Sequence, residues 1–312
     1  LPQYLRFVRG VVDSDDLPLN VSRELLQENP LVGKIRSSVV KRVLDMVGKI
    51  AADEEKYQAF WKQFGEVLKE GPVEDFGNQE KLLKLMRFAS TDAEQGSFTS
   101  LEAYVSRMKA EQDKIYYVTA DSLQAAQNSP HLEVFRKRGI EVLLMHDRVD
   151  EWMMGHVREF DGKSFQSIAK GDLDLSKFEG EKEREAREKA ADEAKPLIER
   201  LKTVLGERVA DVIISHRLTE SPTCLVLDEH EMAVHMQSLL KQAGHAMGGG
   251  KPKLEVNPEH ALIRRVEGVE DEASFEAWAT VLFEQAWLAE GGQLDDPAGF
   301  VRRLNGLLEG TA

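Results

Sequence analysis

The chain has 312 residues, of which 42% are hydrophobic and 31% are charged, and its formal net charge is −14. A chain of this length exceeds what one hydrophobic core usually organises, so we expect two or three compact units of about 100 to 150 residues each. The excess of 55 acidic over 41 basic residues repels phosphates and anionic lipids, which argues against nucleic acid or a membrane as the main partner.

Cysteine content and apolar patterning predict a cytoplasmic protein. Cys224 is the only cysteine, so no internal disulfide and no cysteine-based zinc site can form, which fits a reducing compartment. Apolar runs stay near about five residues, far short of a membrane span, and no signal peptide is visible. We therefore expect a cytoplasmic protein without a metal site.

The first residues predict a strand. Residues 4–12 form an apolar segment, and a strand needs a neighbour on its edge. Because no strand precedes this segment and the sequence starts at Leu1, we expect it to belong to a longer protein.

Helical periodicity dominates residues 31–70. Apolar residues recur at spacings of three and four, which predicts two antiparallel helices, and a third short helix is expected over 82–88. The residues that carry the pattern are Val32, Ile35, Val39, Val43, Met46, Ile50, Phe60, Phe64 and Leu68.

Residues 100–170 alternate between strands and helices. The predicted strands are 114–119 and 141–145, and the predicted helices are 122–138 and 149–160. Basic residues followed by Gly139 mark the end of the first of these helices. Strands separated by helices indicate a small parallel α/β unit.

A charged stretch separates this unit from the rest of the chain. Residues 171–195 consist mostly of Glu, Lys, Asp and Ala, which predicts a solvated linker leading into a helix over 197–205, with a domain boundary near 187. Beyond it we predict strands, a helix and a flexible glycine loop at 209–214, 225–227, 232–240 and 248–250.

The last two predicted helices expose more apolar surface than they can cover themselves. Helix 275–289 carries apolar residues on more than one stripe, and a second helix follows over 300–308. A helix bundle completed by a twofold-related copy covers both, whereas the alternative is a tail packed on its own domain. The residues predicted at this dimer interface are Phe275, Trp278, Leu282, Trp287, Phe300, Leu304, Leu307 and Leu308.

Two apparent catalytic motifs fail on spacing. His230 and His235 are five residues apart, which turns them about 140° from each other on a helix and disfavours a shared metal. The glycine run before Lys251 lacks the first glycine of a phosphate loop, and Pro252 replaces the hydroxyl that would hold magnesium. We find no complete active site.

The segment around Arg23 allows two interpretations. Asn20 or Ser22 can cap a helix that starts at Arg23, with Glu24 in its first turn. A guanidinium beside a helix start also presents a rigid bidentate cation to a phosphate. The residues alone do not decide between the two.

The same segment, residues 13–27, resembles the signature loop of the ninety-kilodalton heat-shock chaperones. Five further segments match that family in order, and weaker similarity continues to the end of the chain, closest to bacterial members. These segments are 69–75, 85–91, 104–108, 114–119 and 150–154. Residues 308–312 lack the acidic tail by which eukaryotic cytosolic members recruit tetratricopeptide co-chaperones, so the resemblance implies no such partner.

The resemblance implies an α/β fold (α+β overall) in four parts. These are the end of a large middle subdomain with the arginine loop, a helical connector, a small α/β/α layer subdomain, and a mixed C-terminal domain ending in a helical dimerisation bundle. The corresponding ranges are 1–30, 31–96, 97–186 and 187–312.

In this family an N-terminal domain, not contained in this sequence, binds ATP and Mg²⁺. Carried over, Arg23 would reach the γ-phosphate when the dimer closes, with Asn20 and Gln27 as supporting groups. We expect ATP and magnesium in the longer protein, and we expect this chain alone to bind neither and to be inactive.

The resemblance also implies a client-binding cleft between the small α/β subdomain and the C-terminal domain. Methionines give a repackable surface suited to many unfolded chains, although core packing is the alternative for a helix face spanning 232–240. The matching residues are Glu151, Trp152, Met153, Met154, Met232, Met236, Leu239 and Leu240.

Together these features predict a dimeric molecular chaperone that binds unfolded or partly folded client proteins. A passive dimeric scaffold is the first alternative. A self-sufficient nucleotide hydrolase that uses Arg23 and the glycine loop is the second, and the failed phosphate-loop spacing argues against it.

Overall fold

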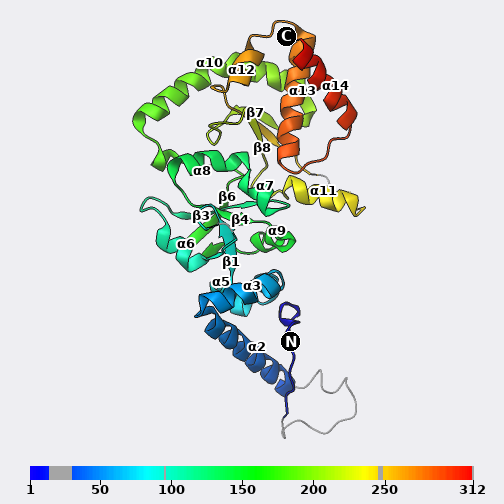
Figure 1. The fold of residues 1–312 in the computed structure, drawn as a ribbon. Helices are drawn as coiled ribbons and strands as arrows, with labels where there is room; N and C mark the ends of the chain where they lie inside the picture. Colours follow the sequence, from blue (N-terminus) through cyan, green and yellow to red (C-terminus); the bar gives the residue numbers. More distant parts are fainter. Residues whose placement is uncertain (14–29, 95, 245–248, 311–312) are drawn as a thin grey trace.

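The computed structural model of the protein describes residues 1–13, 30–94, 96–244 and 249–310 (Figure 1). Three tiers follow one another along the molecule: helices near one end, a six-stranded sheet in the middle, and a largely helical C-terminal part around a smaller sheet. This is the mixed α/β fold, α+β overall, that the sequence predicted. Arg23, with Asn20 and Gln27, lies outside the described residues.

The first tier is helical, as the periodicity of residues 31–70 predicted. Its elements are η1 (Gln3–Leu5), α2 (Pro30–Ala51), α3 (Glu54–Leu68), α4 (Gly71–Glu74), η2 (Phe76–Asn78) and α5 (Gln79–Leu85). The carboxylate of Asp53 caps α3 by accepting the Lys56 N–H at 3.2 Å. The third helix ends at Leu85, earlier than predicted, because Phe88 belongs to a strand.

The strand predicted over residues 4–12 is wrong, since residues 1–13 contain a 3₁₀ helix and no strand. The carboxylate of Glu74 accepts the N–H of Gln3 at 2.8 Å and of Tyr4 at 3.0 Å. The Tyr4 ring is buried, and its hydroxyl donates to Asp75 at 2.8 Å. The Glu74 carboxylate on α4 therefore accepts from two backbone N–H groups that would otherwise need acceptors on a partner strand.

The middle tier is a six-stranded sheet with a parallel centre, as predicted. Its strands are β1 (Arg87–Ser90), β2 (Thr99–Ser100), β3 (Lys114–Thr119), β4 (Leu143–Met145), β5 (Glu159–Phe160) and β6 (Lys163–Ser167). They lie in the order β2-β1-β4-β3-β6-β5, and β3 pairs in parallel with β4 and β6. The outer pairings are antiparallel.

Short helices connect these strands or, in the case of the last one, follow them. They are α6 (Leu101–Arg107), α7 (Leu123–Gln127), η3 (Pro130–Leu132), α8 (Glu133–Arg138), α9 (Arg148–Met154) and η4 (Ser176–Phe178). The helix predicted over 122–138 is interrupted, because Pro130 lacks an N–H and starts a separate 3₁₀ turn. Gly139 ends α8 in the left-handed conformation, with φ 58° and ψ 43°, as predicted.

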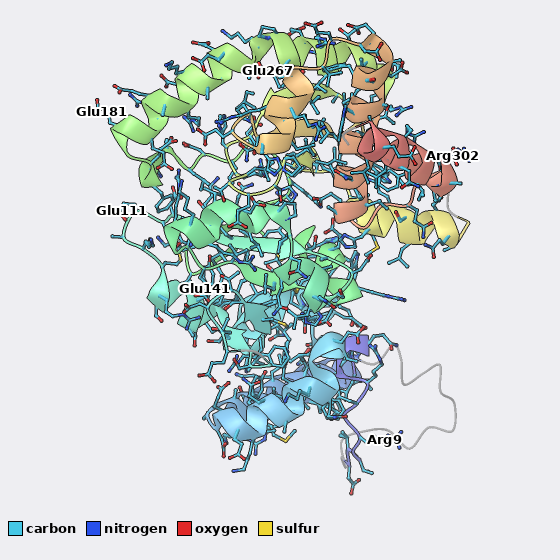
Figure 2. All side chains as sticks on the ribbon, turned by 45° about the horizontal axis from the view of Figure 1, so that its top comes forward. Arg9, Glu111, Glu141, Glu181, Glu267 and Arg302 are labelled. Carbon is cyan, nitrogen blue, oxygen red and sulfur yellow. The ribbon has the colours of Figure 1, made fainter. Side chains whose placement is uncertain are left out.

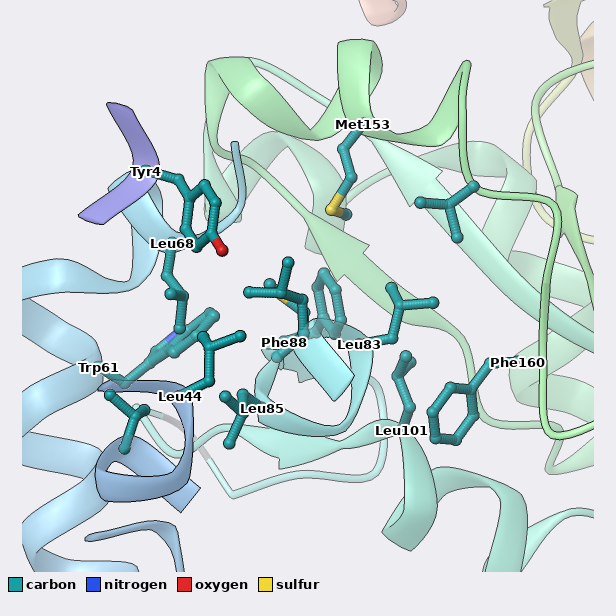
Figure 3. Close-up of a cluster of buried hydrophobic side chains, with 14 of the residues drawn as sticks. Tyr4, Leu44, Trp61, Leu68, Leu83, Leu85, Phe88, Leu101, Met153 and Phe160 are labelled. Carbon is teal, nitrogen blue, oxygen red and sulfur yellow. The ribbon is translucent and has the colours of Figure 1, made fainter. Parts of the chain in front are cut away.

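Both faces of the six-stranded sheet are buried, and successive residues of β3 show how. Ile115 belongs to a first core shared with α2, α3 and α5, whereas Tyr116 and Val118 belong to a core beneath α7 and α8. Figure 3 shows the first core, in which Leu44, Trp61 and Leu68 of the helices join side chains of the middle tier, referred to below as the sheet unit. The labelled sheet-unit residues are Phe88, Leu101, Met153 and Phe160. One continuous core thus ties the helical tier to the sheet.

The third tier surrounds a three-stranded sheet of order β7-β9-β8. Its elements are α10 (Glu181–Leu205), η5 (Gly206–Arg208), β7 (Asp211–Ile214), β8 (Thr223–Val226), α11 (Val234–Gln242), β9 (Lys253–Val256), α12 (Ala261–Glu267), α13 (Glu272–Ala289) and α14 (Pro297–Glu309). A second core of α10, α12, α13 and the strands includes Leu201, Leu254, Phe275 and Leu282. None of the described helices is both long enough and apolar enough to cross a bilayer.

The predicted linker is wrong over its second half, because residues 181–195 are the first part of the continuous helix α10 (Figure 2). Its Glu, Lys, Arg and Ala residues are strong helix formers. Ion pairs four residues apart add to this, such as Arg184 with Glu188 at 3.7 Å. Residue 187, the predicted domain boundary, falls inside α10, and the four domain ranges stay predictions.

Candidate functional site

Three of the predicted client-binding residues, Glu151, Met236 and Leu239, lie where the C-terminal part meets the six-stranded sheet. A hollow of about 230 Å³ opens there between the start of α9 and one side of α11. Its lining comes from both tiers: Ala120, Asp121, His146, Asp147, Arg148, His235, Met236, Leu239 and Gln242. Figure 1 shows α11 at the side of the molecule, near α9.

The helix α9 is held firmly at its N-terminus. Asp147 and Asp150 form a capping box, and both carboxylates accept from the ammonium of Lys69, at 2.6 Å and 3.0 Å. Burial would lower the pKa of Lys69, but the two carboxylates outweigh burial and raise it. A charged lysine at the end of α3 therefore fixes α9 on the helical tier.

Only one of the predicted residues on α9 presents a large apolar surface. Trp152 is 49% exposed, and its ring meets that of His156 edge-on with 5.6 Å between centroids. Met154 is half-buried at the edge of the first core. Met153 is buried inside that core, so its side chain reaches no ligand in this conformation.

The residues predicted on α11 divide in the same way. Met236 and Leu239 are half-buried and line the hollow, and Leu240 is half-buried on the same helix. Met232 is also half-buried but precedes the helix, which begins at Val234. The interpretation that Met232 shares a helix face with the others is therefore wrong.

Glu151 is turned into the junction between the two tiers. Its side chain is 11% exposed, and its carboxylate accepts from Thr119 at 2.7 Å, from the backbone N–H of Ala233 at 3.0 Å, and from the ammonium of Lys170. Burial would raise the pKa of Glu151, but Lys170 and the other two donors outweigh it and hold the pKa below its ordinary value. The group is an ionised acceptor that already takes three hydrogen bonds.

Other polar side chains at this junction were not anticipated from the sequence. Arg217 is buried and reaches the carbonyls of Ile168 and Gly171, and the buried ring of His131 lies 2.8 Å from Glu290. Each joins residues at least 46 positions apart in the chain. No local spacing marks such pairs, so only the folded structure reveals them.

Glu133 forms a further link between the tiers. Its carboxylate, on α8, accepts the backbone N–H groups of Thr219 at 2.6 Å, Glu220 at 2.7 Å and Ser221 at 3.1 Å. Burial would raise the pKa of Glu133, but these three donors outweigh it and lower the pKa. The loop after β7 is thereby held on α8.

The residues predicted for dimerisation fall into two groups. Phe275, Trp278 and Leu282 are buried in the second core, so they support a surface without forming it. The others are half-buried or, for Leu308, exposed: Trp287, Phe300, Leu304, Leu307 and Leu308. A contact with a second chain would come through this second group.

Residues predicted to serve nucleotide chemistry cannot be placed in this way. Arg23, Asn20 and Gln27 lie outside the described residues. Within the described part of the chain, no three His, Cys, Asp or Glu residues converge as metal ligands would.

Comparison with known proteins identifies the class of protein to which this architecture belongs. Residues 1–312 match the Hsp90 protein family, and the chain belongs to that family. The predicted resemblance is confirmed.

Similar proteins each carry the name Chaperone protein HtpG. The chain is 56% identical to that of Nitrosomonas eutropha, 57% to that of Aromatoleum aromaticum and 55% to that of Legionella pneumophila. Each alignment covers 99% of this chain and 48% to 49% of the relative. The chain therefore spans about half the length of the curated relatives it matches.

The Glu133 contact generates a prediction about pH. Its pKa is lowered by folding, so its stabilisation is present above the ordinary value of 4.5 and is lost as the pH falls through the folded pKa. At neutral pH, Glu133→Gln should reduce the free energy of unfolding by about 1 kcal/mol, and the difference from wild type should shrink towards acid pH.

Urea unfolding at a series of pH values measures this effect. Glu276→Gln, an exposed glutamate on α13, is the matched control and should leave the midpoint unchanged. Equal midpoints for wild type and Glu133→Gln at neutral pH would contradict the assigned role.

Proposed function

We propose that this chain is the client-binding and dimerising part of a cytoplasmic Hsp90-family chaperone. Its membership of the family and the printed name of its relatives support the chaperone class. The observation that carries the client-binding part is the exposed Trp152, one turn of α9 beyond Arg148, which lines the hollow together with Met236 and Leu239. The lone buried Cys224 is consistent with a reducing cytoplasm.

The geometry of this surface suits a binder of unfolded segments. Arg148 lines the hollow, and Trp152 follows it by one turn of α9, so the two residues are neighbours on the helix surface. Across it, α11 offers a flexible methionine and a leucine, while Asp121 and Asp147 leave polar groups at the rim. A mixed surface, in which a few apolar side chains lie among polar ones, can take up varied segments of an unfolded chain without demanding one sequence.

Removing the apolar contacts tests the client-binding proposal. Trp152→Ala combined with Met236→Ala should weaken binding of an unfolded polypeptide about tenfold, because buried aromatic anchors dominate such interfaces. The measurement is suppression of aggregation of a chemically denatured protein, followed by light scattering.

The matched control is Phe76→Ala, which removes a 66% exposed aromatic ring from η2 of the helical tier, an element that contributes nothing to the lining of the hollow. It should behave as wild type. If the wild-type chain suppresses no aggregation at all, the passive scaffold is the better description and the proposal fails.

We propose that α14 forms the centre of a dimer interface. Phe300, Val301, Leu304, Leu307 and Leu308 cover an arc of about 120° on this helix, at about 100° per residue. Val301 is 51% exposed, and Leu288 of α13 is also exposed. Exposed apolar residues on neighbouring helices are the expected surface for an isologous contact.

A charge in this arc should separate the dimer. Val301→Glu places a carboxylate on an exposed position, so the fold should persist while the dimer dissociation constant rises by about tenfold or more. Sedimentation equilibrium measures it. Arg302→Gln makes the same change in net charge about 100° around the helix and should leave the dissociation constant unchanged. A wild-type chain that is monomeric at high concentration would refute the interface.

We propose that Arg23, supported by Asn20 and Gln27, contributes to hydrolysis of Mg-bound ATP by an N-terminal domain of the longer protein. Family membership and the motif in residues 13–27 support this. A positioned guanidinium stabilises charge that develops on the transferred phosphoryl group.

In the longer protein, Arg23→Ala should therefore lower kcat for ATP hydrolysis on the order of 10²-fold or more. Arg36→Ala, at an exposed position on α2, is the control and should keep wild-type turnover. Titration of this chain alone with Mg-ATP in a calorimeter should give no binding heat. Saturable binding would favour the self-sufficient hydrolase instead.

A further inference from the structure

The helix α11 has no N-terminal cap of its own. Its N-cap residue is Ala233, whose side chain cannot accept a hydrogen bond. Helices usually satisfy their first N–H groups with a Ser, Thr, Asp or Asn at this position. An uncapped start is therefore a weak point, unless another element supplies an acceptor.

Burial decreases steadily along α11 away from that start. Val234 and His235 are buried, residues 236–240 are half-buried, and residues 241–244 are exposed. Figure 1 shows the helix extending outward from the body of the molecule. The direction of α11, and with it the position of Met236 and Leu239, therefore depends on how its first turn is held.

The neighbouring helix α9 instead supplies an acceptor for the N–H of the N-cap residue itself. The Oε1 atom of Glu151 accepts the N–H of Ala233 at 3.0 Å, a bond that in a capping box comes from the helix's own first turn. Its negative charge also lies at the positive end of the α11 dipole. Lys170 donates to the same oxygen and Thr119 donates to the other one, and together they fix the carboxylate in this orientation.

The loop leading into α11 is also held at its other end. Gly171 donates to the carbonyl of Leu227 at 2.8 Å, and Leu227 donates to Ala169 at 3.4 Å, in a short parallel bridge. The chain between Leu227 and Ala233 is thus attached to the sheet unit on both sides. Glu151 supplies the attachment nearer to the helix.

We propose that Glu151 is a positioning residue, which caps α11 from the neighbouring α9 and thereby holds Met236 and Leu239 over the hollow. This inference rests on the proposed client-binding function. It gives Glu151 an indirect part in client binding, in place of a direct contact with the client. Three donors already hold this carboxylate and its side chain is only 11% exposed, so little of it is open to direct contact with a client.

Hydrogen exchange of the client-free chain tests the cap. Glu151→Ala should accelerate exchange of the amides in the first turns of α11, within residues 234–240, by about tenfold. Affinity for reduced, carboxyamidomethylated ribonuclease, a permanently unfolded polypeptide, should fall about fivefold or more. Glu151→Gln keeps the shape of the side chain and one acceptor, so its exchange rate and affinity should lie between those of Glu151→Ala and wild type. It replaces Glu151→Ala in the test if that variant does not fold.

Two further variants separate positioning from other roles. Glu229→Gln removes an exposed carboxylate from the loop before α11 and should leave exchange and affinity at wild-type values. The swap Glu151→Lys with Lys170→Glu keeps an ion pair but places a donor where Ala233 needs an acceptor. Exchange should stay fast in the swap if Glu151 caps α11, whereas a role limited to the ion pair predicts recovery.

The outcomes distinguish this inference from the proposed function. Unchanged α11 exchange in both Glu151→Ala and Glu151→Gln overturns the positioning role, and a loss of affinity in those variants would then indicate direct contact. Fast exchange in Glu151→Ala supports the cap, even if Trp152→Ala with Met236→Ala binds clients normally. That last result would refute only the proposed client surface.

Discussion

The arrangement of the two sheets depends on one buried guanidinium. Arg217 is 3% exposed, and its Nη2 and Nε atoms lie 3.0 Å and 3.1 Å from the carboxylate of Glu255 on β9, while Nη1 donates to the carbonyl of Ile168 beyond β6. Removing two charges from water costs several kcal/mol, which only well-aligned partners offset. Any shift of one sheet against the other would separate these partners, so Arg217 fixes their relative position.

The junction differs in kind from the cores on either side of it. The cores consist of apolar side chains. The first core joins the helical tier to the six-stranded sheet, another core lies beneath α7 and α8, and the second core lies within the third tier. Between the sheet unit and the C-terminal part, the contacts are instead directional and charged, through Glu133, Glu151 and Arg217. Apolar packing gives each tier its stability, and the polar contacts decide how the tiers are oriented.

Local chemistry explains which elements could be predicted from the sequence. The helices α2 and α3, the strands β3 and β4, and the stop at Gly139 follow from periodicity and from a single left-handed residue. Short strands such as β1 and β5 exist only because a neighbour offers them an edge, so nothing in their own residues marks them. The continuous α10 was mistaken for a linker because strong helix formers and a solvated charge pattern look alike in sequence.

The predicted site residues show the same division between what local sequence determines and what long-range packing determines. The resemblance assigned Glu151, Trp152 and Met236 to one site, but it carried no information on which side chains point inward. The burial of Met153 and the three hydrogen bonds to Glu151 arise from long-range packing. Met232 lies outside α11 because this helix starts after Ala233. Position in a motif therefore indicates where a site lies, while the part that each residue plays there is decided by its tertiary partners.

The two exposed apolar surfaces are supported differently, and this difference fits different tasks. Beneath α14, the helix α13 is buried through Phe275, Ala279 and Leu282, which gives the proposed dimer surface a stiff base. By contrast α11 is secured mainly at its first turn, and its remaining length is half-buried or exposed. A helix held at one end can adjust its direction at little cost in packing, because few buried contacts change. A stiff surface suits one constant partner, whereas an adjustable helix with a methionine suits partners of varied shape.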